Sequence, residues 1–307
     1  MHIAKPRALT ALLLLATPLV PASLAAQHGD GWTTDFAAAR ERAAEHGRDV
    51  LVVFTGSDWC SPCIRLARDV WTKSEFVEAA QERYELVVVD NPKGPDVLSP
   101  EQRKTNDALH EEYAVNSWPT VVLTDPEGRP YARTKDYRPG GPAAYLEHLA
   151  ELQKNRAARD AKFAAAEEAE GVERAKLLDA GLRLCGDFIP TGPYEAVIDA
   201  IVAADAENEA GLAMRWRTRR AADALEIELP ALGKAGKWKE LVARIDTFLD
   251  SFEPDDALRQ KTLYWRGVGL AQTGELARAK ESFEAAVALG TDAEYGQRSQ
   301  QMLKRWQ

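Results

Sequence analysis

The amino-acid sequence predicts two folded parts: an α/β domain with a mixed central sheet covered by helices at residues 33–154, and an all-α helical-repeat domain at residues 155–307. Three observations predict this division. Short apolar runs, typical of buried strands, alternate with helical patterns up to about residue 154. Beyond residue 155 the strand patterns stop, and glycines separate runs with helical spacing. A chain of 307 residues also suits two domains better than one small core.

Residues 1–25 have the pattern of a secretory signal peptide. Lys5 and Arg7 precede an apolar run over residues 8–20, and small residues at 22–26 suit cleavage after Ala25, with cleavage after Ala26 as the alternative. A helix over that run would be about 20 Å long, short of the ~30 Å hydrocarbon core of a membrane, so an uncleaved anchor is the less favoured alternative. We therefore expect an exported protein, periplasmic or secreted, that does not span the membrane after cleavage.

Charge and cysteine content narrow the classes of function. The net charge is −9, and loss of residues 1–25 would lower it to −11 because that segment holds one lysine, one arginine and no acid. Such a surface repels nucleic-acid phosphates and anionic lipid headgroups, so neither is an expected partner. The basic run at residues 215–220 (RWRTRR) is interpreted as a solvated helix face. Three cysteines are too few for a disulfide scaffold, and the spacing of two of them favours a working pair.

The first domain begins with a predicted helix, a buried strand and a second helix. Residues Phe36–His46 have amphipathic spacing and are followed by a glycine. Residues 50–54 form a continuous apolar run, as in a strand buried on both faces. A turn at residues 56–58 leads into a helix that starts at a cysteine motif. Thr72, with Glu75 three residues later, predicts the capping box of a further short helix.

The rest of the first domain alternates in the same way. Residues 86–89 form another buried strand, and after a long loop the Ser-Pro pair at 99–100 supplies an N-cap and a first-turn proline for a helix. Residues 120–123 and 130–134 flank a DPEG turn and predict an antiparallel hairpin. A final helix begins near residue 142. The order α-β-α-β-α-β-β-α predicts a mixed sheet covered by helices.

In residues 155–307, helical runs are separated by glycines at positions 171, 181, 192, 236 and 274. Residues 263–286 resemble a tetratricopeptide hairpin in the placement of small and large side chains, and a degenerate copy precedes them. The corresponding glycines, Gly236 and Gly274, are 38 residues apart, slightly more than a ~34-residue unit. We therefore expect a tetratricopeptide-like repeat domain whose ligand is a peptide or protein segment.

The sequence WCSPC at residues 59–63 carries the predicted chemistry, because it follows a buried strand and opens a helix. Free backbone N–H groups at a helix N-terminus carry partial positive charge, so Cys60 should have a lowered pKa and attack disulfides as a thiolate. Cys63 lies one turn inward and can reach back to a mixed disulfide on Cys60. Pro62 fits because the first helical turn tolerates a missing N–H. Cys60 is therefore assigned as the attacking thiol and Cys63 as the resolving thiol.

Other roles for the cysteine pair fit less well. A structural zinc site needs about four ligands, and the remaining cysteine, Cys185, lies in the helical part, where we interpret it as a small buried hydrophobe. A c-type haem requires a histidine after the second cysteine, but residue 64 is isoleucine. A structural disulfide in so short a loop adds little stability. Binding of Cu(I) is a further alternative, without a methionine or histidine cluster to support it.

Residues 33 to about 153 resemble the thioredoxin superfamily, and within it an exported bacterial branch. The resemblance rests on the WCSPC motif after a strand and on NSWPT at residues 116–120 before the hairpin. The phrase FTGSDWC at residues 54–60, with VVVD at residues 87–90 and its long loop, is similar to the exported branch. The resemblance implies a thioredoxin fold for this domain.

The resemblance also implies a substrate site around Cys60. In the superfamily the proline of the second motif is cis and faces the dithiol, which implies the same for Pro119. Trp59, Trp118, Pro119 and Thr120 are therefore the expected substrate-binding residues. The backbone of Trp118 is then expected to pair with an extended substrate segment. Trp59 and Trp118 would form an aromatic rim that grips apolar peptide, although packing alone is an equal interpretation of Trp59.

The sequence departs from thioredoxin itself before the motif. Thioredoxin keeps a buried aspartate on that strand as proton acceptor for the resolving cysteine, whereas residues 51–54 read LVVF here. Proton transfer from Cys63 must therefore use another group or water, and Asp58 is close in sequence.

The leading functional hypothesis is a thiol–disulfide oxidoreductase that acts on cysteine-containing exported proteins with an unidentified redox partner. It is expected to need no metal and no cofactor besides the Cys60–Cys63 disulfide. The residues do not determine whether it reduces, oxidises or isomerises, because the reduction potential depends on how the Cys60 thiolate is stabilised; the thioredoxin likeness favours reduction. The alternative is a binding adaptor, in which the helical domain holds a segment of another exported protein and the dithiol is secondary.

Overall fold

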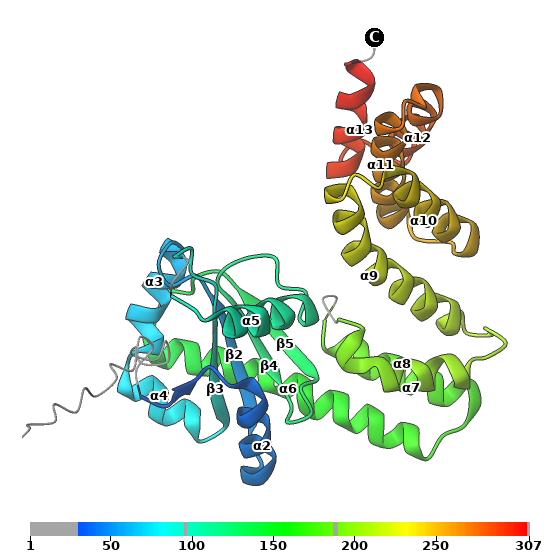
Figure 1. Cartoon of the computed structure of the whole chain (residues 1–307). Helices are drawn as coiled ribbons and strands as arrows, with labels where there is room; N and C mark the ends of the chain where they lie inside the picture. The colour runs from blue at the N-terminus through cyan, green and yellow to red at the C-terminus, as the bar shows by residue number, and fades with distance from the viewer. Residues whose placement is uncertain (1–29, 95–96, 187–189, 306–307) are drawn as a thin grey trace, which may run out of the picture.

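The α/β part forms one five-stranded mixed sheet (Figure 1). The computed structural model describes residues 30–94, 97–186 and 190–305, so the expected signal peptide at 1–25 lies outside the described residues. The strands are β1 (Trp32–Thr33), β2 (Asp49–Thr55), β3 (Tyr84–Asp90), β4 (Thr120–Thr124) and β5 (Pro130–Lys135). Their order in the sheet is β1-β3-β2-β4-β5. The pairs β1–β3 and β3–β2 are parallel, and the pairs β2–β4 and β4–β5 are antiparallel.

Helices cover both faces of this sheet. One face packs against α2 (Phe36–His46) and α5 (Pro100–Glu112). The other face packs against α3 (Ser61–Leu66), the π-helical turn η1 (Ala67–Trp71), α4 (Ser74–Gln81) and α6 (Gly141–Glu167). Alternate residues of β2 point to the two layers: Val50, Val52 and Phe54 to the first, Leu51 and Val53 to the second. The continuous apolar run in the sequence follows from burial on both faces.

The predicted fold of the α/β part is confirmed, with two differences in its elements. β1 was not predicted, because two residues are too few to show a period of alternation. The capping box at Thr72 is wrong: α4 begins at Ser74, and the Thr72 hydroxyl instead donates to the Ala67 carbonyl at the end of the preceding helix, at 3.0 Å. Thr72 therefore ends one helix rather than beginning the next.

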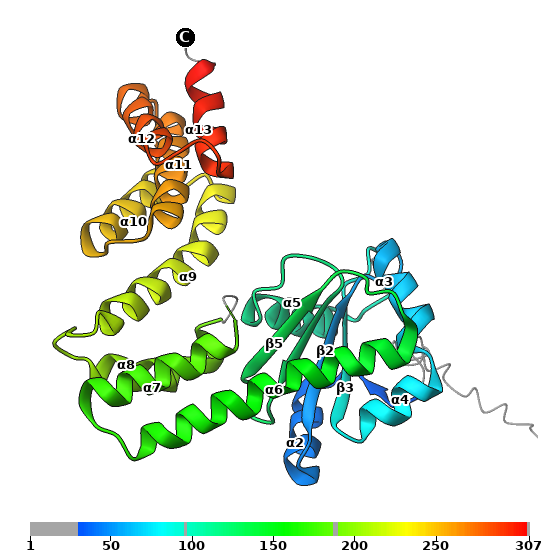
Figure 2. The same ribbon diagram turned by 180° about the vertical axis from the view of Figure 1, so that it is seen from behind.

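α6 joins the two parts of the chain. It runs without a break from Gly141 to Glu167, and Figure 2 shows it crossing the sheet and extending beyond it. The predicted boundary between residues 154 and 155 lies within this helix, so the two parts share it. A continuous helix is stiffer than a flexible linker, so α6 restricts movement of the two parts relative to each other.

The remaining helices are α7 (Gly171–Leu184), the 3₁₀ turn η2 (Gly192–Tyr194), α8 (Glu195–Ala204), α9 (Leu212–Lys234), α10 (Trp238–Ser251), α11 (Asp256–Gln272), α12 (Leu276–Ala288) and α13 (Glu294–Lys304). Apolar residues of α7, α8 and the start of α9 belong to the same core cluster as the α6 face of the sheet. A second cluster fills α10 to α12. Among the described helices, none is long and apolar enough to cross a bilayer.

One glycine of this part does not separate helices as predicted. Gly181 lies inside α7, where a Cβ would approach the Phe163 ring of α6 to 2.6 Å. It therefore permits close helix packing, whereas Gly236 and Gly274 end helices with positive φ values of 70° and 82°.

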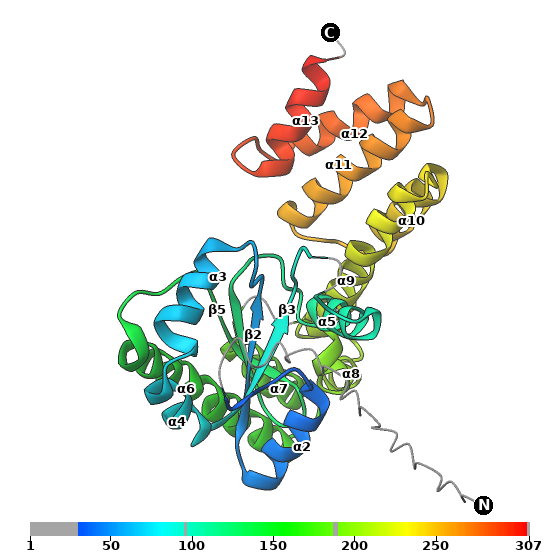
Figure 3. The ribbon, with the colours of Figure 1, turned by 60° about the vertical axis from the view of Figure 1, so that its left-hand side comes forward.

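The α9–α10 and α11–α12 hairpins repeat the same local geometry. In both, the glycine N–H donates to the carbonyl three residues earlier, at 3.1 Å. Residues 38 positions apart occupy matching buried places, namely Leu241 and Ala279, Ile245 and Phe283, and Phe248 and Ala286. Figure 3 shows α11, α12 and α13 stacked side by side. This equivalence supports two related hairpins, while the tetratricopeptide likeness stays a prediction.

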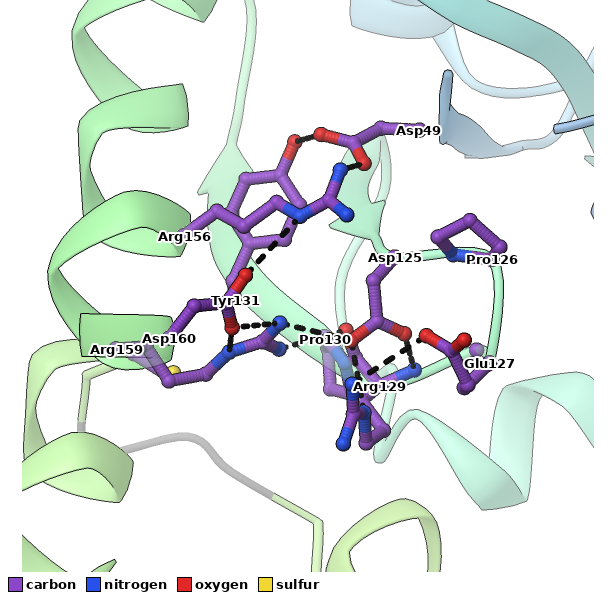
Figure 4. A network of polar contacts seen from close by, with 12 residues as sticks. Asp49, Asp125, Pro126, Glu127, Arg129, Pro130, Tyr131, Arg156, Arg159 and Asp160 are labelled. Atoms are coloured by element: carbon purple, nitrogen blue, oxygen red, sulfur yellow. Dashed lines mark hydrogen bonds and ion pairs between the residues drawn. The ribbon is translucent and has the colours of Figure 1, made fainter. Parts of the chain in front are cut away.

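A buried polar network joins α6 to the β4–β5 hairpin (Figure 4). The fully buried Arg159 guanidinium donates to the Asp125 carboxylate and to the Tyr194 hydroxyl, each at 2.8 Å. The Tyr194 hydroxyl in turn donates to the Pro130 carbonyl at 2.9 Å. Arg156 pairs with the buried Asp49 at the start of β2. Buried charges persist when they are paired, so the helical part is anchored to the sheet through these contacts.

Candidate active site

The cysteine motif lies at the carboxyl end of β2, where α3 begins. Cys60 and Cys63 are joined by a disulfide, with their Cα atoms 5.2 Å apart. Cys60 is the N-cap residue of α3, and the Cys63 N–H points to the Cys60 sulfur at 3.3 Å. An N–H directed at this sulfur stabilises a thiolate when the pair is reduced. The local order strand, turn, helix therefore places the predicted attacking sulfur at a helix N-terminus.

The two sulfurs differ in access. Cys60 is 5% exposed and Cys63 is 1% exposed. The surrounding residues therefore cover most of Cys60 and nearly all of Cys63. An incoming disulfide can reach Cys60 first. This difference agrees with the roles assigned from the sequence.

Trp59 packs over the turn that precedes the motif. A Cβ on Gly56 would lie 2.5 Å from the Trp59 ring, so only glycine leaves room there for the indole. The Trp59 indole N–H donates to the Asn91 carbonyl at 2.8 Å, and the Lys93 ammonium lies 4.9 Å from the ring centroid. These contacts hold Trp59 between the motif and the loop after β3.

The peptide bond between Trp118 and Pro119 is cis, as the resemblance implies. The Trp118 ring lies edge-to-face with the Trp59 ring, with centroids 5.6 Å apart. The two indoles therefore pack against each other, while their role as a rim around Cys60 stays a prediction. Within the described part of the chain, the backbone N–H and C=O of Trp118 make no hydrogen bond. Both groups are therefore available to an extended partner strand.

Thr120 has a different place from the other predicted substrate residues. Its side chain is fully buried, and its hydroxyl donates to the Ser117 carbonyl at 2.7 Å. It holds the turn before β4, so its side chain supports the cis peptide rather than facing substrate.

Asp58 fixes the loop that follows β3. Its carboxylate accepts the Lys93 N–H at 3.0 Å and the Gly94 N–H at 3.1 Å. The hydrogen bond from the Lys93 backbone is the main cause that lowers the pKa of Asp58, with a further contribution from Gly94. A carboxylate with a lowered pKa is a weak base, so this geometry favours a positioning role over proton transfer from Cys63.

Two contributors to the site were not predicted from the sequence. The buried Asp90 at the end of β3 accepts the Ser57 N–H at 2.9 Å and the Ser57 hydroxyl at 2.5 Å, which ties β3 to the turn before the motif. The sequence feature that could have indicated Asp90 is an acidic residue at the end of a buried apolar run. His110 of α5 packs between Phe54, at 5.0 Å, and Trp118, at 5.6 Å between ring centroids.

Cys185 contacts residues of the helical part and none of the redox motif. It ends α7, is 2% exposed, and its sulfur lies 3.6 Å from both the Gly181 carbonyl and the Tyr194 hydroxyl. Burial raises the pKa of the Cys185 thiol. These contacts agree with the interpretation as a buried structural residue.

Comparison with known proteins places the α/β part among thioredoxin-like sequences. Residues 31–126 match the model of a thioredoxin-like family. Disulfide bond reductase DsbH of Chlamydia pneumoniae is 35% identical over 114 residues, which cover 37% of this chain and 68% of that protein. Thioredoxin-related protein DsbJ of Chlamydia pneumoniae is 32% identical over 127 residues, which cover 38% of this chain and 36% of that protein.

A solved structure of a DsbH oxidoreductase is also similar to part of the chain. It is 34% identical, has a TM-score of 0.38, and the match covers 40% of this chain and 83% of that chain. The matches to the two Chlamydia pneumoniae proteins leave more than half of this chain uncovered.

Proposed function

Since this chain belongs to the thioredoxin-like family, we propose that it is a disulfide reductase of exported proteins that works through Cys60 and Cys63. The observation that carries the proposal is the position of the Cys60 sulfur at a helix N-terminus, where the Cys63 N–H points to it at 3.3 Å; the Trp118 backbone, which makes no hydrogen bond among the described residues, supports it. This arrangement combines a stabilised thiolate with a place for an extended substrate. The name of the relative DsbH supports the direction of the reaction.

The proposed reaction transfers two electrons from the Cys60–Cys63 dithiol to a substrate disulfide. The Cys60 thiolate attacks one sulfur of a substrate disulfide, and a mixed disulfide forms while the other substrate sulfur leaves as a thiolate and takes up a proton. Cys63 loses its proton and attacks the Cys60 sulfur, which releases the second substrate thiol. The substrate disulfide is reduced and the Cys60–Cys63 pair is oxidised. An external dithiol donor then restores the reduced pair, with no metal or further cofactor.

Two measurements test this proposal. We expect a reversible two-electron couple with a reduction potential near that of thioredoxin, about −270 mV, by thiol trapping in dithiothreitol buffers. The variant Cys63→Ser should accumulate a mixed disulfide with exported proteins, because the resolving step is lost. Cys60→Ser, the matched control, should trap none. A potential near about −120 mV would contradict reduction, and a dithiol that does not cycle would contradict the whole proposal.

The helical part favours a second candidate, a binding adaptor. A cavity of about 250 Å³ opens between α9, α11 and α13, with an apolar lining that includes Leu229, Trp265 and Tyr295. Apolar pockets with a few polar groups at the edge suit side chains of a partner segment. The double variant Cys60→Ser, Cys63→Ser separates the candidates, since an adaptor would fully rescue a deletion strain without its dithiol and a reductase would not.

A further inference from the structure

A second and larger cavity lies between the α/β part and the helical part. Its volume is about 730 Å³, which falls within the roughly 300–1,000 Å³ of typical ligand sites. One wall is the C-terminal half of α5 with the loop at residues 114–116, and the other is the segment 190–195 with the middle of α9. Figures 1 and 3 show α5 and α8 as neighbours across the junction. We call this space the interdomain cleft.

The interdomain cleft lies close to Trp118 of the redox site. Its loop wall reaches Asn116, two residues before Trp118, and two residues span at most about 7 Å. His110 lines the cleft and also contacts the Trp118 ring, with centroids 5.6 Å apart. The Nε2 atom of His110 and the Nε1 atom of Trp118 are both buried and have no hydrogen-bond partner among the described residues. A chain bound along Trp118 therefore has only a short distance to span before it reaches the cleft.

The charged residues that line the cleft indicate which kind of polypeptide would bind there. The two arginines of the α9 wall are already neutralised, because Arg219 pairs with Asp223 at 3.0 Å and Arg220 with Asp199 at 2.7 Å. The acids Glu111, Glu112 and Glu195 line the cleft and form no ion pair with described residues. Acids that line a cleft between low-dielectric walls concentrate positive charge.

The exposed Ile227, at 63%, adds an apolar contact on the α9 side of the cleft. A long cleft with acids and an apolar residue suits a polypeptide better than a small thiol, which would use only the rim.

We propose that the interdomain cleft binds the basic flank of an extended polypeptide whose cysteine is presented to Cys60, so that the helical part selects substrates. This inference rests on the proposed function and names its substrate class. The comparisons give it no precedent, because the matched relatives share only 37–38% of this chain. The preference is set by Glu111, Glu112 and Glu195.

The experiment measures the rate constant for oxidation of the prereduced full chain in single turnover. Its substrates are two peptides with one cysteine in a mixed disulfide with 2-mercaptoethanol, flanked by lysines in one and by glutamates in the other. Bis(2-hydroxyethyl) disulfide serves as the small reference. We expect the basic peptide to react about tenfold faster than the acidic one at low salt, with the difference falling as salt rises.

Two cleft variants have matched controls. The triple variant Glu111→Gln, Glu112→Gln, Glu195→Gln should remove most of the preference. Its control, Glu41→Gln, Glu78→Gln, Glu207→Gln, changes the net charge equally at exposed positions elsewhere and should keep the preference. Ala224→Trp should obstruct the cleft and slow both peptides, whereas Ala165→Trp on the exposed side of α6 should not. None of these variants should alter the reaction with the small disulfide.

The outcomes separate this inference from the proposed function. If the small disulfide does not oxidise the reduced chain, the proposed function fails. If it does, but the two peptides react equally or the control variant loses the preference as fully as the cleft variant, the interdomain cleft is not the binding site.

Discussion

At the scale of single residues, the redox motif depends on side chains that hold neighbouring loops. Asp58 is exposed, yet its carboxylate binds two consecutive N–H groups of the loop after β3. Asp90 does the same for Ser57 from inside the sheet. The motif and the loop that supports Trp59 are therefore held by carboxylates, not by apolar packing alone.

The hydrogen bonds of Asp58 predict how the loop responds to pH. Because the pKa of Asp58 is lowered in the folded chain, its contribution is fully present above the unfolded value of about 3.9 and is lost as the pH falls through the lower folded value. We expect the amide-exchange protection factors of Lys93 and Gly94 to stay constant from pH 7 to about pH 4 and to fall below it. Asp58→Ala should lack that protection at every pH, and Asp250→Ala on α10 should keep it. Protection that falls near pH 6 would contradict this role.

Cys185 leads to a prediction about reactivity. Its burial and raised pKa keep the thiol protonated and inaccessible in the native chain. Alkylation of the reduced native protein with iodoacetamide at pH 8, followed by mass spectrometry, should label Cys60 quickly and Cys185 only after denaturation. Cys185→Ala should change the rate of disulfide exchange by less than about twofold. Equal labelling of Cys60 and Cys185 in the native state would show that the third cysteine takes part in exchange.

At the scale of elements, α6 is held on the β4–β5 hairpin by a charge pair in the core. Burial opposes the charge of Arg159, but Tyr194 and Asp125 together raise its pKa above the ordinary value, so the guanidinium is charged. The carboxylate of Asp125 is fully buried and also binds Arg129 at 2.8 Å. Arg159 and its partners Asp125 and Tyr194 therefore join α6, the β4–β5 turn and η2.

Removal of one partner of this pair should be costly. Arg159→Ala leaves Asp125 buried without its main partner from α6, and such changes reduce the free energy of unfolding by roughly 3–5 kcal/mol. Arg217→Ala, at an exposed position of α9, should change it by less than about 0.5 kcal/mol. Urea unfolding followed by circular dichroism measures both. A small effect of Arg159→Ala would mean that water replaces the arginine.

At the scale of the whole molecule, the core does not divide where the sequence pattern changes. The cluster on the α6 face of the sheet continues through α7 and α8 to Trp216 of α9. The helices from α10 onward have a core of their own. The α/β part and the first helices are therefore one packed unit, which keeps the interdomain cleft in a defined shape.

This continuity predicts the behaviour of fragments. A chain of residues 26–154 ends inside α6 and lacks Arg156 and Arg159, so Asp49 and Asp125 would lose their basic partners from that helix. We expect it to unfold at lower urea concentration than the full chain and to bind more of an apolar dye. A chain of residues 26–234 keeps the continuous core and should match the full chain in the stability of the α/β part. Equal stability of all three would contradict a shared core.

Local spacing was enough to predict most of the secondary structure of the α/β part, with the exception of β1, as well as the cysteine motif and its likeness to thioredoxin. Alternation, caps and breakers act over a few residues, and Phe36–His46 and the Ser99 cap occur where the pattern predicts them. The wrong capping box at Thr72 shows the limit of this reasoning, since the same hydroxyl can end one helix or begin another.

The surroundings of the motif and the junction between the two parts follow from long-range packing, which the sequence pattern does not show. His110 lies 56 residues after its ring partner Phe54, and Arg159 lies 34 residues after its ion-pair partner Asp125, and both contacts depend on how helices pack on a twisted sheet. The same packing sets β1 beside β3, continues α6 past the predicted boundary and opens the interdomain cleft. Such contacts join distant segments through shape and burial, and no spacing along one chain records them.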